Sequence, residues 1–354
     1  MKILFGVQGT GNGHITRCRT LALAFKEAGV DVDYIFSGRD PGDYFDMQAF
    51  NQYRTFSGMS FETTNGKINL RKTIKRIHAF RLIKDVKELD LSDYDCIISD
   101  FEPVSAWAAK HQQLDCIGIS NQAVTQYIQP KEYGLIARTI MKFYAPVSRP
   151  VALHWFHFGH PLIPPIVDKL EPTSQKDHIV VYLPFESIAD IKSLLAPFQD
   201  QQFYCFHPSI KTSQQDGHIS LHPLCREVFT RSVAESAGII TNTGFALISE
   251  ALVLGKKILT KPVSGQFEQI YNAECLAKLD LAQVMQTLEQ DKLRQWLTLP
   301  SPDPVIYPNV AKELVSWIVN NQKEDFSELS RRLWSQVKYP AHVEQKIKAL
   351  GFEL

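Results

Sequence analysis

Residues 241–273 read TNTGFALISEALVLGKKILTKPVSGQFEQIYNA and combine a turn, a helix, a strand and a second loop. Gly238 to Thr241 predicts the end of a buried strand. The turn Asn242-Thr243-Gly244 has residue types that begin helices, and Ala246 to Leu254 has helical spacing. Lys257 to Thr260 then predicts a second strand. The segment is typical of two neighbouring strands in an α/β sheet.

The start of the predicted helix can bind an anion. Backbone N–H groups around Gly244, Phe245 and Ala246 point out of the helix start, where the helix dipole is positive. A diphosphate can therefore bind there without a metal ion. Glu250 lies about one and a half turns further along the helix, at a distance suited to the two hydroxyls of a ribose.

A second polar loop, Pro262 to Gln269, is predicted at the carboxyl end of the second strand. Open α/β sheets bind ligands at this edge. Gln266, Glu268 and Gln269 offer acceptors of the kind that hold sugar hydroxyls. The alternative is an ordinary connection with a helix cap and a solvated loop.

The segment resembles the donor-nucleotide region of GT-B glycosyltransferases. The resemblance is to the inverting branch, which includes the lipid II-forming peptidoglycan glycosyltransferase and the UDP-glycosyltransferase-like macrolide and glucuronosyl transferases. The matching residues are Gly244, Glu250, Pro262, Glu268-Gln269 and Asn272-Ala273. The chain departs from the pattern at Asn242, where many relatives carry a phosphate-binding His or Arg. The resemblance implies a nucleotide-sugar donor, UDP-linked, held by Asn242, Thr243, Gly244, Phe245, Glu250, Gln266, Glu268 and Gln269. It also implies transfer of a hexosyl or N-acetylhexosaminyl group, with cell-envelope polysaccharide among the products.

Length and composition agree with a two-domain protein. The chain has 354 residues, with 38 Lys and Arg against 38 Asp and Glu. A balanced charge gives no global field for nucleic acid. The six cysteines have no CxxC spacing and indicate reduced thiols of a cytoplasmic protein. No apolar run reaches membrane-spanning length.

Alternating strands and helices occur twice along the chain, which predicts an α/β fold of two Rossmann-like domains with parallel sheets. With the resemblance, this becomes a GT-B fold whose domains face an interdomain cleft. We expect an acceptor-binding domain at 1–160, a linker at 161–177 and a nucleotide-sugar domain at 178–320. Residues 321–354 are expected to form helices that pack back on the first domain.

The loop Gly9-Thr10-Gly11-Asn12-Gly13-His14 follows the first predicted strand. It fails the dinucleotide fingerprint, because position 14 is His instead of the third Gly and no acidic residue ends the second strand. It resembles the Gly-rich turn of the GT-B acceptor domain. That resemblance assigns the acceptor side to Gly9, Gly11, Asn12, Gly13 and Arg17.

His14 is the candidate catalytic base. Transfer with inversion needs a group that takes the acceptor's proton near neutral pH, and His titrates closest to that range. Asp100 ends the strand Cys96 to Ser99, at the sheet edge of the Gly-rich loop, and is the candidate partner of His14. The alternatives are His14 as a helix-start residue, Asp100 as a helix cap, and Glu102 in the place of Asp100.

Two missing features predict the stereochemistry and the metal requirement: a second glutamate and a well-placed Asp-x-Asp motif. Many retaining GT-B enzymes carry a glutamate eight positions before the ribose-binding one, and here that position is Asn242, so inversion is preferred. Asp31-Val32-Asp33 and Asp93-Tyr94-Asp95 match the metal-binding letters of GT-A enzymes but lie at strand entrances. We therefore expect neither a metal nor another cofactor.

The expected partners are the donor and a sugar, glycolipid or small-molecule acceptor, with no nucleic acid. Lys67 to Lys87 carries eight basic residues on a helix predicted from Ile68 to Leu89. That face suits anionic lipid on the inner side of a membrane, a phosphorylated acceptor or plain solvent. A nucleotide-sugar 2-epimerase and a non-catalytic nucleotide-sugar sensor are the alternative functions.

Overall fold

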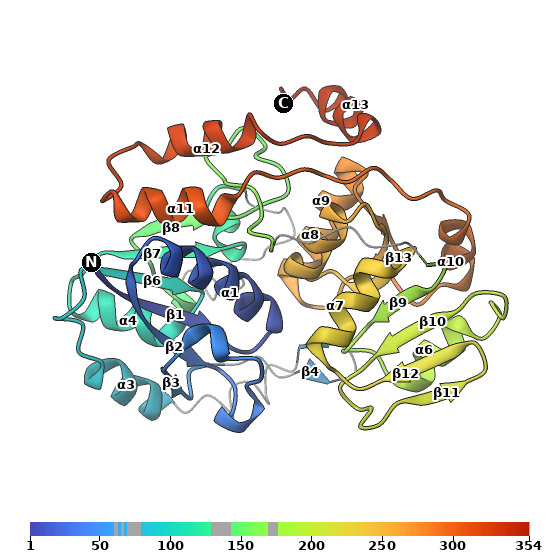
Figure 1. The fold of residues 1–354 in the computed structure, drawn as a ribbon, viewed down its shortest axis with the longest axis horizontal. Helices are drawn as coiled ribbons and strands as arrows, with labels where there is room; N and C mark the ends of the chain where they lie inside the picture. Colours follow the sequence, from blue (N-terminus) through green and yellow to red (C-terminus); the bar gives the residue numbers. More distant parts are fainter. Residues whose placement is uncertain (60–62, 65–66, 69–78, 129–142, 169–175, 354) are drawn as a thin grey trace. The chain divides into compact units, whose positions relative to one another are not determined.

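The computed structural model describes residues 1–59, 63–64, 67–68, 79–128, 143–168 and 176–353, and these form two compact units. Unit 1 contains Met1–Glu62, Asn69–Asp168 and Tyr307–Gln336. Unit 2 contains Thr63–Ile68, Lys169–Ile306 and Val337–Leu354. Each unit has its own open sheet with helices around it (Figure 1). The predicted α/β class with two Rossmann-like units is confirmed.

The boundaries of the units differ from the predicted ones. Residues 161–168, predicted as a linker, belong to unit 1, because the carbonyl of Leu162 accepts hydrogen bonds from Ser330 Oγ and from Trp334 Nε1. Residues 307–320 also belong to unit 1 instead of the second domain. The final helix α13 (Ala341–Ala349) packs on α9 (Phe267–Leu279) of unit 2.

The sheet of unit 1 has six strands, all parallel, in the order β3-β2-β1-β6-β7-β8. They are β1 (Lys2–Gln8), β2 (Asp31–Ser37), β3 (Tyr53–Phe56), β6 (Cys96–Asp100), β7 (Cys116–Ser120) and β8 (Arg149–Ala152). The chain adds β2 on one side of β1 and later β6 on the other, so the strand order reverses between β1 and β6. Ligands of open α/β sheets bind beyond the carboxyl ends of the strands at this switch point.

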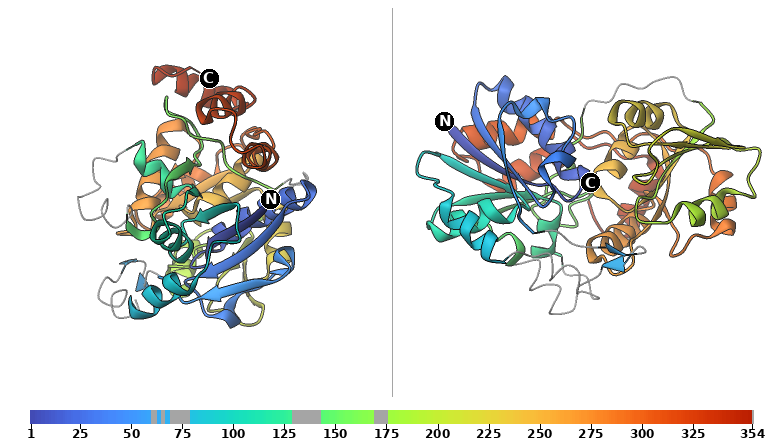
Figure 2. Two further views of the ribbon diagram at one scale, coloured as in Figure 1. Left: turned by 90° about the vertical axis from the view of Figure 1, so that its left-hand side faces the viewer. Right: turned by 90° about the horizontal axis from the view of Figure 1, so that it is seen from below.

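Helices cover both faces of this sheet. Successive residues of a strand point to opposite faces. The ring of Phe5 lies 6.4 Å from that of Phe25 in α1 (Asn12–Glu27), whereas Leu4 shares a core cluster with Val104 of α4 (Pro103–His111). The helix α11 (Val310–Val319) packs against α1, and α12 (Phe326–Trp334) follows it. Figures 1 and 2 show α11 in orange-red beside the blue α1.

The sheet of unit 2 has seven strands in the order β11-β12-β10-β9-β13-β14-β15, and only the β11–β12 pair is antiparallel. The strands are β9 (Ile179–Tyr182), β10 (Phe203–Phe206), β11 (Gln214–Asp216), β12 (Ile219–His222), β13 (Gly238–Asn242), β14 (Lys257–Lys261) and β15 (Gln283–Val284). The helices before α9 are α6 (Ile188–Leu195), α7 (Arg226–Glu235) and α8 (Phe245–Val253), and α10 (Gln290–Leu297) follows it. The switch point of this unit lies between β9 and β13.

The helix predicted from Ile68 to Leu89 is described only in its second half. Lys67 and Ile68 form β5, which pairs with β4 (Thr63–Thr64), and α3 spans Ala79–Glu88. Residues 69–78 lie outside the described residues. In the described part of the chain, no helix is both long enough and apolar enough to cross a membrane.

Gly6 provides a test of how tightly β1 packs on α4. A Cβ at Gly6 would lie 2.1 Å from Oγ of Ser105 and 2.7 Å from Oε2 of Glu102, both of which are buried. We therefore expect Gly6→Ala to destabilise unit 1 by about 1–3 kcal/mol through overpacking. The measurement is the midpoint of thermal unfolding. Gly42→Ala is the control, because a Cβ at Gly42 would meet no atom within 4 Å. Equal midpoints for the two variants would contradict the packing described for β1.

Candidate active site

The Gly-rich loop of unit 1 connects β1 directly to α1. The N–H of Gly9 donates to the carbonyl of Ser37 at 2.7 Å and holds the loop against the end of β2. The helix begins at Asn12, so Asn12, Gly13 and His14 form its first turn. Gly11 is the N-cap residue and no side chain caps the helix. A Cβ at Gly11 would meet open space, which leaves the helix start accessible.

His14 and Asp100 form a hydrogen-bonded pair across the switch point of unit 1. Nδ1 of His14 lies 2.7 Å from Oδ1 of Asp100. Val7 of β1 and Asp100 of β6 are register partners, so the two carboxyl ends lie side by side. Nδ1 also lies 2.7 Å from Nη2 of Arg17, and with a proton on Nδ1 the imidazole donates to the carboxylate of Asp100. The other nitrogen, Nε2, then carries a lone pair.

Arg17 holds Asp100 from the next turn of α1. Its Nε lies 2.6 Å from Oδ2 of Asp100 and its Nη2 lies 2.5 Å from Oδ1, which is the two-pronged geometry of strong ion pairs. Asp100 is fully buried and Arg17 is 3% exposed. Burial by itself would raise the pKa of Asp100, but the charges of Arg17 and His14 hold it below its usual value. Asp100 is therefore an ionised, fixed partner for His14.

Glu102 caps a helix and does not contact His14. Its carboxylate accepts from the N–H of Val104 at 2.8 Å and of Ser105 at 2.6 Å, at the start of α4. Ser37 Oγ donates to the same carboxylate at 2.5 Å. Burial raises the pKa of Glu102. A helix-cap role was one alternative for Asp100, but the residue that caps α4 is Glu102. With its carboxylate at the start of α4, Glu102 is not the partner of His14 in this arrangement.

The backbone between the two carboxylates explains their different roles. Phe101 has a φ of 52°, in the left-handed region that residues other than Gly seldom adopt. Its ring stacks on that of Tyr144 with centroids 4.6 Å apart, which stabilises the turn. The turn points Asp100 towards α1 and Glu102 towards α4. The residues around Phe101 do not predict this left-handed conformation.

Two further residues belong to this site and were missed in the sequence. Asn121 Oδ1 accepts from Nη1 of Arg17 at 2.9 Å, and Nε2 of Gln122 lies 3.4 Å from Nε2 of His14. Both follow β7 directly. Their position after a parallel strand, at the edge where Asp100 ends β6, was the signal that could have identified them. Of the predicted acceptor-side residues, Asn12 accepts from Nη2 of Arg39 at 3.0 Å.

The turn after β13 in unit 2 is held by buried side chains. Asn242 Nδ2 donates to the carbonyl of Lys261 at 3.0 Å, and Thr243 Oγ1 lies 2.9 Å from Thr260 Oγ1. Gly244 is the N-cap residue of α8 and no side chain caps this helix either. A Cβ at Gly244 would meet open space. The entrance of α8, with the buried Phe245 as its first residue, is therefore a helix start of the anion-binding type.

The predicted polar loop of unit 2 is shorter than expected. The helix α9 begins at Phe267, so Glu268 and Gln269 lie in its first turn and Gln266 is its N-cap residue. Gln269 is buried, and its Oε1 accepts from the N–H groups of Thr243 at 3.1 Å and Val263 at 3.0 Å. It thereby joins the two loops that were predicted to bind the donor. Glu250 is half-buried in α8.

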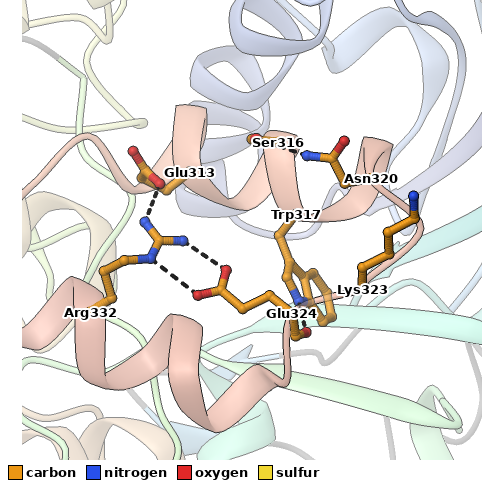
Figure 3. Close-up of a pocket in the computed structure, with 7 residues that line it drawn as sticks. All are labelled: Glu313, Ser316, Trp317, Asn320, Lys323, Glu324 and Arg332. Carbon is orange, nitrogen blue, oxygen red and sulfur yellow. Dashed lines mark hydrogen bonds and ion pairs between the residues drawn. The ribbon is translucent and has the colours of Figure 1, made fainter.

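Each unit contains a cavity lined by described residues. The smaller one, about 270 Å³, lies between α11 and α12, where Arg332 pairs with Glu313 and Glu324 (Figure 3). It contains none of the predicted site residues. The larger one, about 660 Å³, lies at the carboxyl ends of β9 and β14 in unit 2 and is lined by Glu186 and Lys261 among others. That edge is where the sheet topology favours a ligand.

Comparison with known proteins agrees with this architecture. Residues 1–300 match the family model described as glycosyl transferase family 1. No curated protein matches the chain.

Similar solved structures share the fold at low sequence identity. The kitacinnamycin glycotransferase is 13% identical with a TM-score of 0.59, covering 99% of this chain and 98% of its own. Arabidopsis thaliana UGT89C1, solved with UDP, is 12% identical with a TM-score of 0.56, covering 94% of this chain and 99% of its own. LpCGTa, also in complex with UDP, is 13% identical with a TM-score of 0.58, covering 94% and 98%. These similarities confirm the expected GT-B fold, and the match over residues 1–300 means that the chain belongs to glycosyl transferase family 1.

Proposed function

We propose that this glycosyltransferase moves a hexosyl or N-acetylhexosaminyl group from a UDP-linked donor to an acceptor hydroxyl, with inversion and without a metal ion. The observation that carries the proposal is the 2.7 Å contact between His14 Nδ1 and the buried carboxylate of Asp100. A UDP-linked donor is supported by the UDP complexes of two similar structures. A small hydroxylated acceptor is supported by the quercetin complex of UGT89C1.

His14 acts as the general base. Its Nε2 removes the proton of the acceptor hydroxyl while the oxygen attacks the anomeric carbon of the donor sugar. The new glycosidic bond forms as the bond from that carbon to the diphosphate breaks, and the nucleoside diphosphate leaves with the electron pair. Asp100 then stabilises the imidazolium, and Arg17 keeps Asp100 in place.

The donor is held by unit 2. The N–H groups at the start of α8 stabilise the charge that develops on the leaving diphosphate. Glu250 accepts hydrogen bonds from the ribose hydroxyls, and Gln266 and Glu268 bind sugar hydroxyls. Gln269 contributes by joining the Thr243 turn to the loop at Val263. Asn242 in place of a retaining glutamate supports inversion.

The base is tested by His14→Gln and Asp100→Asn. We expect each to lower kcat by about 10²–10⁴-fold, because the acceptor proton no longer has a fixed base to receive it. The measurement is UDP release with an acceptor that the wild-type chain glycosylates. Affinity for UDP should stay at the wild-type value in His14→Gln. Asp115→Asn is the control, since Asp115 forms a 2.7 Å pair with Arg149 near the amino ends of the same strands. A His14→Gln variant that keeps more than a tenth of the wild-type kcat would rule out this base.

Glu250→Ala tests the ribose contact. We expect UDP to bind about ten- to a hundredfold more weakly, the loss associated with a hydrogen bond to a charged group. A thermal-shift titration with UDP measures this, because ligand binding stabilises the folded chain. Glu274→Ala, on the exposed side of α9, should retain the wild-type shift. An unchanged response in Glu250→Ala would remove the assigned contact, and no response of the wild type to any nucleotide-sugar or nucleoside diphosphate would reject the proposed function.

A peripheral contact of the protein with an anionic membrane is supported by α3. Phe80 is 93% exposed and Ile83 is 52% exposed, and they lie on one helix face with Lys84 and Lys87. Aromatic and aliphatic side chains beside Lys are typical of helices that bind lipid surfaces. The basic residues at 71–76 lie outside the described residues.

Vesicle co-sedimentation tests this contact. We expect more of the wild-type chain to bind phosphatidylglycerol vesicles than phosphatidylcholine vesicles, because the first are anionic. The double variant Phe80→Ser, Ile83→Ser should lose most of that binding. Equal sedimentation of wild type and variant with both vesicles would count against a role for α3, and Leu114→Ser, exposed elsewhere in unit 1, is the matched control.

A further inference from the structure

The resemblance to GT-B glycosyltransferases implies a phosphate-binding His or Arg at position 242, which here is Asn. A leaving diphosphate carries two or more negative charges, which N–H groups at a helix start offset only in part. Another residue close to Asn242 could therefore supply the positive charge.

Lys261 is the closest neighbour of Asn242 on the next strand. The two residues are register partners at the carboxyl ends of β13 and β14, and Asn242 Nδ2 donates to the carbonyl of Lys261. Ile240 and Leu259, two residues earlier on the same strands, belong to the core cluster under α6 and α10. Since side chains two apart share a face, Asn242 and Lys261 face the α6 side together.

Lys261 forms an ion pair that spans the end of β13. Its Nζ lies 2.7 Å from Oε1 of Glu186, and the two side chains are only 9% and 12% exposed. Glu186 follows β9, whereas Lys261 ends β14, and β13 lies between these strands. The pair therefore crosses the end of β13, where the turn Asn242-Thr243-Gly244 begins. This is the switch point of unit 2.

Two observations indicate that the arrangement is open to a ligand. An ammonium group has three N–H donors, and in the described part of the chain Glu186 is the acceptor that pairs with Nζ of Lys261. Asn242 is only 4% exposed, and its buried Oδ1 has no hydrogen-bond partner among the described residues. Such a group can accept a hydrogen bond from a bound molecule. Both Lys261 and Glu186 line the cavity of about 660 Å³.

We propose that Lys261 supplies the positive charge for the diphosphate of the nucleotide-sugar donor, with Glu186 holding its ammonium group over the end of β13. The proposal rests on the proposed function of unit 2 as the donor-binding half. Lys261 donates its remaining N–H groups to phosphate oxygens, and Asn242 Oδ1 accepts from a hydroxyl of the donor. Lys261 thus takes the place of the absent phosphate-binding His or Arg at position 242.

The test compares UDP with uridine, which lacks the diphosphate, by calorimetric titration of the full chain. Lys261→Met should bind UDP about ten- to a hundredfold more weakly, the loss associated with a charged hydrogen bond, and should bind uridine as the wild type does. Lys261→Arg should retain most of the affinity for UDP, because it keeps the charge. Lys192→Met is the matched control, since Lys192 also forms a 2.7 Å pair with a carboxylate in unit 2, that of Asp216.

Glu186→Gln separates a ligand-binding lysine from a purely structural ion pair. It keeps a hydrogen-bond acceptor for Lys261 and removes a negative charge near the diphosphate, so affinity for UDP should stay equal or rise. If Glu186→Gln weakens UDP as much as Lys261→Met does, or if Lys261→Met weakens UDP and uridine equally, the pair is structural and the proposal fails. If the wild type binds uridine and UDP, and Lys261→Met binds UDP with the same affinity as the wild type, this proposal alone is overturned. A wild type that binds neither overturns the proposed function as well.

Discussion

The site of unit 1 depends on the buried carboxylate of Asp100. A carboxylate without solvent exposure is costly unless positive groups and N–H donors surround it, and here Arg17 meets both of its oxygens while His14 meets one. Both partners, Arg17 and His14, come from the first two turns of α1. The ion pair thus fixes where α1 begins relative to β6, and it orients the imidazole at the same time. One interaction serves the fold and the proposed chemistry.

The two units share one topology but surround the switch point with different polar groups. Each has its switch point beside the first strand of its sheet, and each presents a helix with a Gly N-cap there. In unit 1 the polar groups around that helix are titratable or charged, which suits proton transfer. In unit 2 they are the neutral side chains of Asn242, Thr243 and Gln269, with one buried Lys–Glu pair alongside. The division fits an acceptor-activating half and a donor-binding half.

Position along the strands was the predictable part of the site. His14 follows β1, whereas Asp100 ends β6 and Asn242 ends β13, and the sequence pattern placed each at the carboxyl edge of a parallel sheet. The choice between Asp100 and Glu102 was not predictable, because it depends on the left-handed backbone of Phe101 and on which helix each carboxylate then meets. The contacts of Asn121, Gln122 and Lys261 were not predictable either, although the position of the first two after a strand was. Their partners Arg17, His14 and Glu186 are distant in sequence.

The sequence by itself determined the alternation of strands and helices, the two α/β units and the residue types at the strand ends, because these follow from local periodicity and turn chemistry. Only the tertiary structure decided the pairing of charges and the boundaries of the units. Leu162 belongs to unit 1 because Ser330 and Trp334, far along the chain, donate hydrogen bonds to its carbonyl. Lys261 reaches Glu186 across the end of β13, because the sheet places β14 and β9 on either side of that strand. Local sequence carries no record of such long-range contacts.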